Sequence, residues 1–201
     1  MTTIDTVDEL RRLFAEPGER AVRKQLARLD RHCRRFIELA PFLVLASAND
    51  THLGASPRGG EPGFVKVVDD ATLWIPDAPG NNRLDSLQNI VTTGRAGLLF
   101  LIPGVDETLR VNGAARLSAD PETLRQFTTE KRTPKIVVEV TVEEAYLHCA
   151  KALMRSKLWA DDSRRERSVL PTLGEMLAEQ TGTGGRQESQ EEMVARYEKD
   201  L

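Results

Sequence analysis

The chain of 201 residues is 40% hydrophobic, and its 28 lysines and arginines against 31 aspartates and glutamates give a formal charge of −3. This length and composition predict one sizeable core with extensions and exclude a chain that is disordered throughout. Because the charge is nearly balanced, no global basic field attracts nucleic acid, and any anion site has to be local. The N-terminal residues contain neither the apolar run of a signal peptide nor a membrane span, so we expect a cytoplasmic protein without a membrane partner.

The two cysteines, Cys33 and Cys149, are too few for a disulfide framework. Each follows a histidine, His32 or His148, and these pairs raise the alternative of a metal site. Adjacent residues point to different faces of a helix or strand, and no third ligand stands at a zinc-like spacing. We therefore expect no metal.

The first segment, residues 1–40, is predicted to be helical. Thr6 and Glu9 form a capping-box pattern that opens a short helix through Phe14. After Pro17 and Gly18, apolar residues at helical spacing predict a second helix over residues 19–39. Its arginines alternate with acids, which favours a solvated helix face over the alternative of a nucleic-acid surface.

Residues 41–149 are predicted to form a mainly β core. Alternating or continuous apolar runs predict strands at residues 42–48, 53–56, 64–68, 72–75, 96–102, 108–118 and 135–142. Residues 96–102 are nearly all apolar, as in a strand buried on both faces, and Gly113 in the next strand indicates that another backbone or a flat ligand comes close. The short connections favour a closed or partly closed antiparallel β-barrel of six or seven strands.

A phosphate cradle is predicted inside this core. Lys66 points to one defined side of its strand, and the loop at residues 59–63 lets Arg58 turn back over the strands. Asn82 as N-cap and Asp85 at N3 predict a helix over residues 83–91, whose free N–H groups lie beside Arg83. The alternative is three unrelated surface cations on a β-meander.

Residues 150–201 are predicted to form a C-terminal helical arm on the same single domain. Lys151, Arg155 and Trp159 fall on one helical stripe, which either reaches a ligand or is a solvated stripe with one packed tryptophan. Residues 161–167 predict a charged linker, and residues 173–180 a helix whose apolar stripe needs a partner surface. A polar helix over residues 187–201 follows.

The strings SPRGG, PGFVKV, TLWIPD, PGNNRLDSLQNI and GLLFLIPGVDETLRVNGAARLS, in this order within residues 42–118, resemble the pyridoxamine 5′-phosphate oxidase-related FMN-binding family. HCAKALMRSKLW and LPTLGEML are similar to one bacterial branch of it. The resemblance implies a split β-barrel and a homodimer with FMN at the subunit interface. It also implies hydride transfer between FMN and an unidentified small molecule, with no catalytic residue indicated. The alternatives are a non-enzymatic flavin carrier and a binder of deazaflavin or haem.

The resemblance also implies which residues contact the cofactor. The phosphate would be held by Arg58, Lys66 and Arg83, with Asn81, Asn82 and Ser86 near the helix start, and the isoalloxazine would pass the backbone of Ile75 and Pro76. Further contacts from the same or the partner subunit would come from Arg110, Lys151, Arg155 and Trp159. The vitamin B6 oxidases carry an Arg-x-Val-Leu-Leu-Lys string, whereas Arg58 precedes Lys66 across a Gly/Pro loop. Their C-terminal Arg-x-His motif has no counterpart here, so we expect no efficient oxidation of pyridoxamine phosphate.

Overall fold

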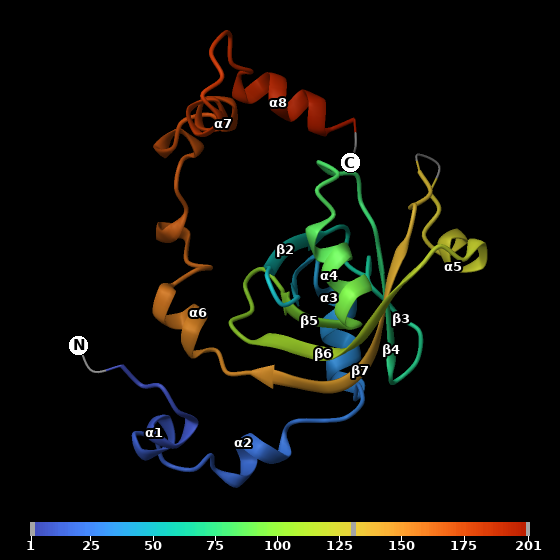
Figure 1. Ribbon diagram of the computed structural model, residues 1–201, viewed down its shortest axis with the longest axis vertical. Coiled ribbons are helices and arrows are strands. Elements are labelled where there is room, and N and C mark those ends of the chain that lie inside the picture. Colours follow the sequence, from blue (N-terminus) through green and yellow to red (C-terminus); the bar gives the residue numbers. More distant parts are fainter. Residues whose placement is uncertain (1–2, 130–131, 200–201) are drawn as a thin grey trace.

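The computed structural model describes residues 3–129 and 132–199, and within them seven strands form one antiparallel sheet (Figure 1). The strand order is β2-β1-β5-β6-β7-β4-β3. The strands are β1 (Phe42–Ala48), β2 (Leu53–Gly59), β3 (Lys66–Val67), β4 (Thr72–Pro76), β5 (Arg95–Leu101), β6 (Thr108–Ser118) and β7 (Val137–His148). Every neighbouring pair is antiparallel.

The sheet is curled but open. β2 and β3 form its two edges and do not pair with each other, yet only residues 60–65 connect them. Six residues span at most about 20 Å, so the two edges must approach each other. The prediction of a six- to seven-stranded antiparallel split barrel is therefore confirmed.

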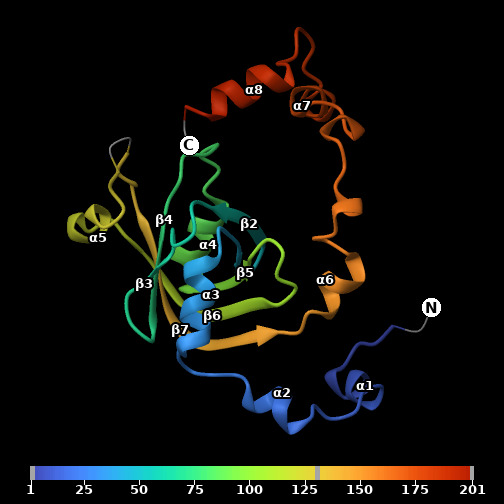
Figure 2. The ribbon, with the colours of Figure 1, turned by 180° about the vertical axis from the view of Figure 1, so that it is seen from behind.

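Two helices cover the core from opposite ends of the curled sheet: α4 (Asp85–Thr93) lies in front in Figure 1 and α3 (Arg31–Leu39) in front in Figure 2. α3 begins at Asp30, whose carboxylate accepts hydrogen bonds from the backbone N–H groups of His32 and Cys33 at 2.9 and 2.8 Å. Both helices bury apolar residues among the inward-facing side chains of the strands. The barrel thus has one continuous core.

The N-terminal segment differs from the prediction of one helix over residues 19–39, which is wrong. The capping box of Thr6 and Glu9 is confirmed and opens α1 (Val7–Arg12), but α2 (Glu19–Arg23) is short. Leu26 exchanges backbone hydrogen bonds of 2.9 and 2.8 Å with Ala145, so this stretch is extended beside β7. The two hydrogen bonds to β7 satisfy backbone groups that a continuous helix would also satisfy, so the local helical pattern does not decide the conformation here.

β7 runs through residues 143 and 144, beyond the end of the strand predicted over residues 135–142. The pairing with β6 shifts by one residue between Asn112 and Gly113, which accommodates an extra residue of β7 as a bulge. A Cβ on Gly113 would stand 1.9 Å from the carbonyl oxygen of Thr141, so the predicted close approach at Gly113 is confirmed, and the approaching group is backbone.

β5 is buried on one face only. Ala96, Leu98 and Phe100 point into the core, whereas Leu99 and Leu101 on the outer face are half-buried. The prediction of burial on both faces is therefore wrong for the single chain, because nothing in the described residues covers the outer face of this strand completely.

After the short helix α5 (Pro121–Arg125) and β7, the C-terminal arm leaves the barrel as an open arc (Figure 1). It contains α6 (Lys151–Ser156), two 3-10 turns (Asp161–Ser163 and Arg167–Val169), α7 (Leu173–Thr181) and α8 (Gln190–Tyr197). Capping boxes at Thr172 and Ser189 open α7 and α8. None of α1, α2, α6, α7 and α8 contains a buried residue. In the described part of the chain, no helix has the length and apolarity to cross a membrane.

Candidate functional site

One wall of the candidate site is the inner face of β2. Arg58 is paired with Leu43, a fully buried residue of β1, so Gly54, Ser56 and Arg58 share the face that points into the barrel. The guanidinium of Arg58 folds back along this face and donates hydrogen bonds to the hydroxyl of Ser56 at 2.5 Å and to the carbonyl of Pro57 at 2.9 Å.

The opposite wall is the first turn of α4. Ser86 is buried there, and a Cβ on Gly54 would stand 3.4 Å from its hydroxyl oxygen, so the start of α4 lies directly against β2. Asn89, one turn further, donates to the hydroxyl of Ser47 at 3.1 Å and accepts from the side chain of Asn49 at 2.7 Å. These hydrogen bonds fix α4 against the β1–β2 hairpin.

The start of α4 has a strained backbone and no side-chain cap. The predicted N-cap Asn82 is wrong: the N-cap is Leu84, two residues later, with a left-handed φ of 60°. Asn82 itself has a φ of 58°, and Asn81 instead accepts a hydrogen bond from the backbone N–H of Arg83 at 3.1 Å. Asparagine tolerates this conformation, but at Leu84 it costs about 1–2 kcal/mol, and such strain gathers at ligand sites.

The electrostatic surroundings of the two walls are unequal. Burial lowers the pKa of the Arg58 guanidinium, and the negative charge of Asp77, just after β4, opposes this shift. Arg132 donates a hydrogen bond to the carbonyl of Asp77. Arg83 is exposed and paired with Asp85 at 2.9 Å. Arg83 thus lies at the α4 start, whereas Arg58 lies on the face of β2 whose Gly54 contacts α4.

Lys66 lies on the other side of the sheet. It pairs with Trp74, which pairs with Glu139, and these residues form a row on the outer face. Its ammonium group donates to the carbonyl of Gln126 and stands 4.9 Å from the centre of the Phe127 ring. The register therefore places Lys66 and Arg58 on opposite faces. Ile75 is buried in the core of β4, and Pro76 is half-buried at its end.

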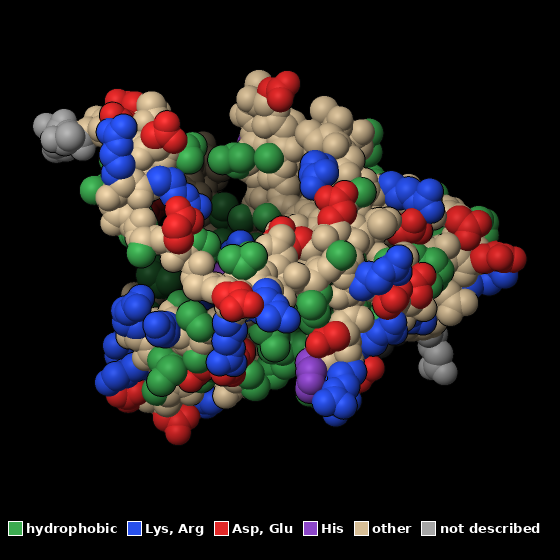
Figure 3. All heavy atoms as spheres, turned by 90° about the horizontal axis from the view of Figure 1, so that it is seen from below, with side chains coloured by type: hydrophobic (Ala, Val, Ile, Leu, Met, Phe, Trp, Pro, Cys, Tyr) green, Lys and Arg blue, Asp and Glu red, His purple; other side chains and the backbone are tan. Residues whose placement is uncertain are grey.

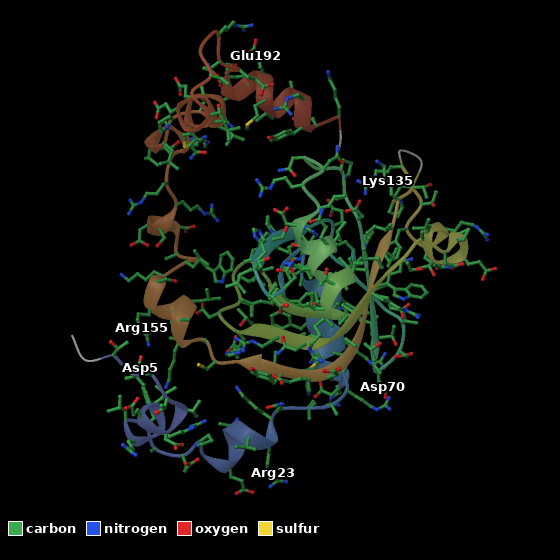
Figure 4. All side chains as sticks on the ribbon, viewed as in Figure 1. Asp5, Arg23, Asp70, Lys135, Arg155 and Glu192 are labelled. Carbon is green, nitrogen blue, oxygen red and sulfur yellow. The ribbon has the colours of Figure 1, made fainter. Side chains whose placement is uncertain are left out.

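The remaining predicted residues lie at the far ends of β6 and β7 and on the arm. Arg110 is half-buried on the outer face and donates to the hydroxyl of Tyr146 at 3.0 Å. Lys151 and Arg155 are exposed on α6, and Figure 4 shows Arg155 far from Lys135 at the other side of the barrel.

The predicted stripe of Lys151, Arg155 and Trp159 is wrong at Trp159, because Lys157 adopts a left-handed φ of 52° and ends α6 before it. The indole N–H of Trp159 donates to the carbonyl of Val105 at 2.9 Å. A pocket of about 300 Å³ lies here, lined by Gly104, Asp106, Leu153, Met154, Lys157, Trp159 and Ala160.

Sequence reasoning missed several residues of these surroundings. Ser56 carries a usable signal, because it stands two residues before Arg58 in a strand and therefore shares its face. Asp77 and Arg132 carry none, since only the fold brings them together. Among the described residues, no group of three histidine, cysteine, aspartate or glutamate side chains could hold a metal ion.

Comparison with known proteins gives a family. A family model described as pyridoxamine 5′-phosphate oxidase matches residues 29–149, from just before α3 to just after β7. No curated protein matches the chain. Similar solved structures include HupZ from Group A Streptococcus, with 14% identity over 59% of this chain and 93% of that chain and a TM-score of 0.49.

Two further similar structures come from other bacteria. A Lactobacillus delbrueckii protein named for pyridoxamine 5′-phosphate oxidase is 17% identical over 61% of this chain and 98% of its own, with a TM-score of 0.48. General Stress Protein 26 from Bacillus anthracis is 13% identical over 58% of this chain and 93% of its own, with a TM-score of 0.43.

Proposed function

The chain belongs to the pyridoxamine 5′-phosphate oxidase family, and from that premise we propose that it binds FMN and acts as an FMN-dependent oxidoreductase. The observation that carries the proposal is the uncapped, strained start of α4 directly against the inner face of β2, with Arg83 at this helix start and Arg58 on the same face of β2. Free N–H groups at a helix start and two guanidinium groups suit a dianionic phosphate.

Each phosphate contact has a chemical role in this proposal. Arg83 exchanges its pairing with Asp85 for the phosphate, and the N–H groups of the first α4 turn bind the remaining oxygens. Arg58 binds from the β2 side, where burial removes competing water, and Ser86 is close enough to add a hydroxyl. The amides of Asn81 and Asn82 close the loop above. A charge-assisted hydrogen bond of this kind contributes about 1.5–3 kcal/mol.

The rest of the proposed site orients the flavin ring. FMN supplies hydride transfer at its N5 atom, so the chain has to bind, orient and exclude water rather than provide an acid or base. The backbone of Ile75 and Pro76 passes the edge of the isoalloxazine. Lys66 joins the site only by leaving the carbonyl of Gln126, and Arg110, Lys151, Arg155 and Trp159 extend the site from the same or the partner subunit.

We also propose a homodimer with FMN at the interface. The single chain exposes 14237 Å². A compact monomer of 22.4 kDa exposes only about 9,400 Å² by the usual scaling of surface with mass. The excess lies in helices without a buried residue and on the outer face of β1 and β5, with Phe42 and Leu99. Figure 3 shows hydrophobic side chains around a hollow on one face. A second copy of the chain is the simplest cover for this surface.

The absorption spectrum of the purified protein, with mass spectrometry of the released ligand, tests the cofactor. We expect a flavin spectrum and the mass of FMN; a deazaflavin or haem would overturn the assignment. Anaerobic reduction by NADH or NADPH, followed by oxidation with oxygen or a quinone, then tests catalysis. Bound FMN that undergoes neither step with any of these reactants would identify a carrier instead of an enzyme.

A further inference from the structure

A second group of basic residues gathers around one aromatic ring on the outer face of the barrel. The guanidinium carbon of Arg110 and the ammonium of Lys24 stand 5.6 and 5.2 Å from the centre of the Tyr146 ring. Lys24 also donates to the carbonyl of Leu147 at 2.8 Å. The ring of His148 lies 5.0 Å from that of Tyr146, tilted by 41°. We call Lys24, Arg110, Tyr146 and His148 the outer cationic cluster.

The two cations of this cluster lack an acidic partner. Within residues 3–129 and 132–199, neither Lys24 nor Arg110 has a carboxylate within 4 Å. Other arginines of the same sheet are neutralised: Arg95 pairs with Glu143 and Arg116 with Glu139, both at 2.6 Å. Two like charges held near one ring repel each other, and a bound anion would remove this cost.

The third polar member has an unused nitrogen. Nε2 of His148 is buried and has no hydrogen-bond partner in the described part of the chain. Burial lowers the pKa of His148, and the positive charges of Arg110 and Lys24 lower it further, which favours the neutral imidazole. Buried polar atoms without a partner are rare, and each calls for a missing ligand or water. An N–H on this atom could donate to an anion held by the two cations.

The geometry points to a binding site for an oxyanion, a carboxylate or a phosphate, at Lys24, Arg110 and His148, and we propose that it holds the acidic group of the small molecule that reacts with the flavin. One guanidinium nitrogen of Arg110 donates a hydrogen bond to the hydroxyl of Tyr146, and the other N–H donors are available to a ligand. The cluster lies on the outer face and Arg58 on the inner face, so it is separate from the proposed phosphate cradle. Only the identity of the bound molecule rests on the proposed function.

The site can be observed directly because the chain has three histidines. Imidazole NMR signals of the full-length protein are recorded during titration with inorganic phosphate and, separately, with acetate, and His148→Gln assigns the signal of interest. We expect a saturable shift of the His148 signal and a rise of its pKa, because a nearby anion stabilises the imidazolium. A larger effect of phosphate identifies a phosphorylated substrate, and a larger effect of acetate a carboxylic acid.

Variants test the two cations. Lys24 is exposed, so Lys24→Met should fold normally and weaken anion binding at least tenfold, and Arg110→Met should weaken it more. Arg116→Met is the matched control on the same strand and face, and it should leave binding unchanged because Arg116 is already paired. An absent or unsaturable shift, or an equal loss in Arg116→Met, overturns the proposal.

The cofactor and the cluster can fail separately. FMN affinity is measured for the same variants. If Lys24→Met weakens the binding of FMN but not the binding of phosphate, the cluster contacts the cofactor. This result overturns the substrate site, whereas the proposal that the protein binds FMN is retained. If the protein binds no FMN but binds phosphate saturably at His148, the proposal of the anion site is retained and the proposal of FMN binding is overturned.

Discussion

Gly113 on β6 and Thr141 on β7 approach so closely that a Cβ on Gly113 would stand 1.9 Å from the carbonyl oxygen of Thr141 and 2.9 Å from its carbonyl carbon. Both atoms belong to the backbone at the bulge, where no side chain can rotate away. We expect Gly113→Ala to destabilise the protein by at least about 3 kcal/mol, because the two central strands must separate locally. Urea unfolding measures the loss.

Gly18→Ala is the control for this prediction, since a Cβ at Gly18 would meet nothing within 4 Å. It should change the free energy of unfolding by less than about 1 kcal/mol. Equal stabilities of the two variants would show that the β6–β7 bulge relaxes easily.

The strands could be predicted because each carries its own alternation of buried and exposed residues. Local pattern also predicts the helix cap at Thr6, which is confirmed. The break between α2 and α3 was not predictable, because Leu26 is held by Ala145, which is 119 positions later in the chain. No signal within residues 19–39 reveals that partner.

The candidate site was predictable as a set of residues but not as a geometry. Arg58 and Lys66 are close in sequence, yet opposite pairing partners, Leu43 and Trp74, place them on different faces of the sheet. Local pattern predicts the helix start at Asn82, a good N-cap residue, whereas the N-cap in the structure is Leu84. Local propensity favours unstrained backbone conformations, so it does not predict strain of this kind.

The two cysteines should react differently. Burial raises the pKa of the Cys33 thiol to about 11, whereas Cys149 is exposed. The thiolate is the reactive form, so at pH 8 the native protein should consume one equivalent of a thiol reagent rapidly and a second only after unfolding. Cys149→Ser should abolish the rapid equivalent. Rapid loss of two equivalents from the native wild-type protein would contradict the burial of Cys33.

The left-handed conformation of Leu84 predicts an inverted order of two variants. Glycine is ordinarily less favourable than alanine by about 0.5–1 kcal/mol, but a left-handed backbone costs a residue with a Cβ about 1–2 kcal/mol. Leu84→Gly should therefore be at least as stable as Leu84→Ala in urea unfolding. The usual order, with alanine clearly more stable, would show that Leu84 is not held at a φ of 60° in solution.

The homodimer predicts twice the chain mass of 22.4 kDa in sedimentation at micromolar concentration. Phe42→Glu places a charge on the half-exposed outer face of β1 and should shift the protein toward the monomer. Leu53→Glu is the control, because Leu53 is 83% exposed at the β1–β2 turn against 37% for Phe42. A wild-type monomer that still binds FMN would contradict a cofactor site shared between subunits.

Charge reversal at Arg83 tests the phosphate cradle against a closely matched control. Arg83 pairs with Asp85 at 2.9 Å, and Arg95 pairs with Glu143 at 2.6 Å; their side chains are 68% and 64% exposed. Both reversals change the net charge equally and leave one acid beside another. Only Arg83→Glu also adds a repulsion to a phosphate at the start of α4, so it should raise the dissociation constant of FMN by about 100-fold or more. Arg95→Glu should change it by less than about threefold, because the Debye length in 0.15 M salt is about 8 Å.

Fluorescence titration with FMN measures both constants, and Arg58→Ala provides a second variant from the β2 side. Unchanged affinity in both Arg83→Glu and Arg58→Ala, or the same loss in Arg95→Glu as in Arg83→Glu, would place the phosphate elsewhere.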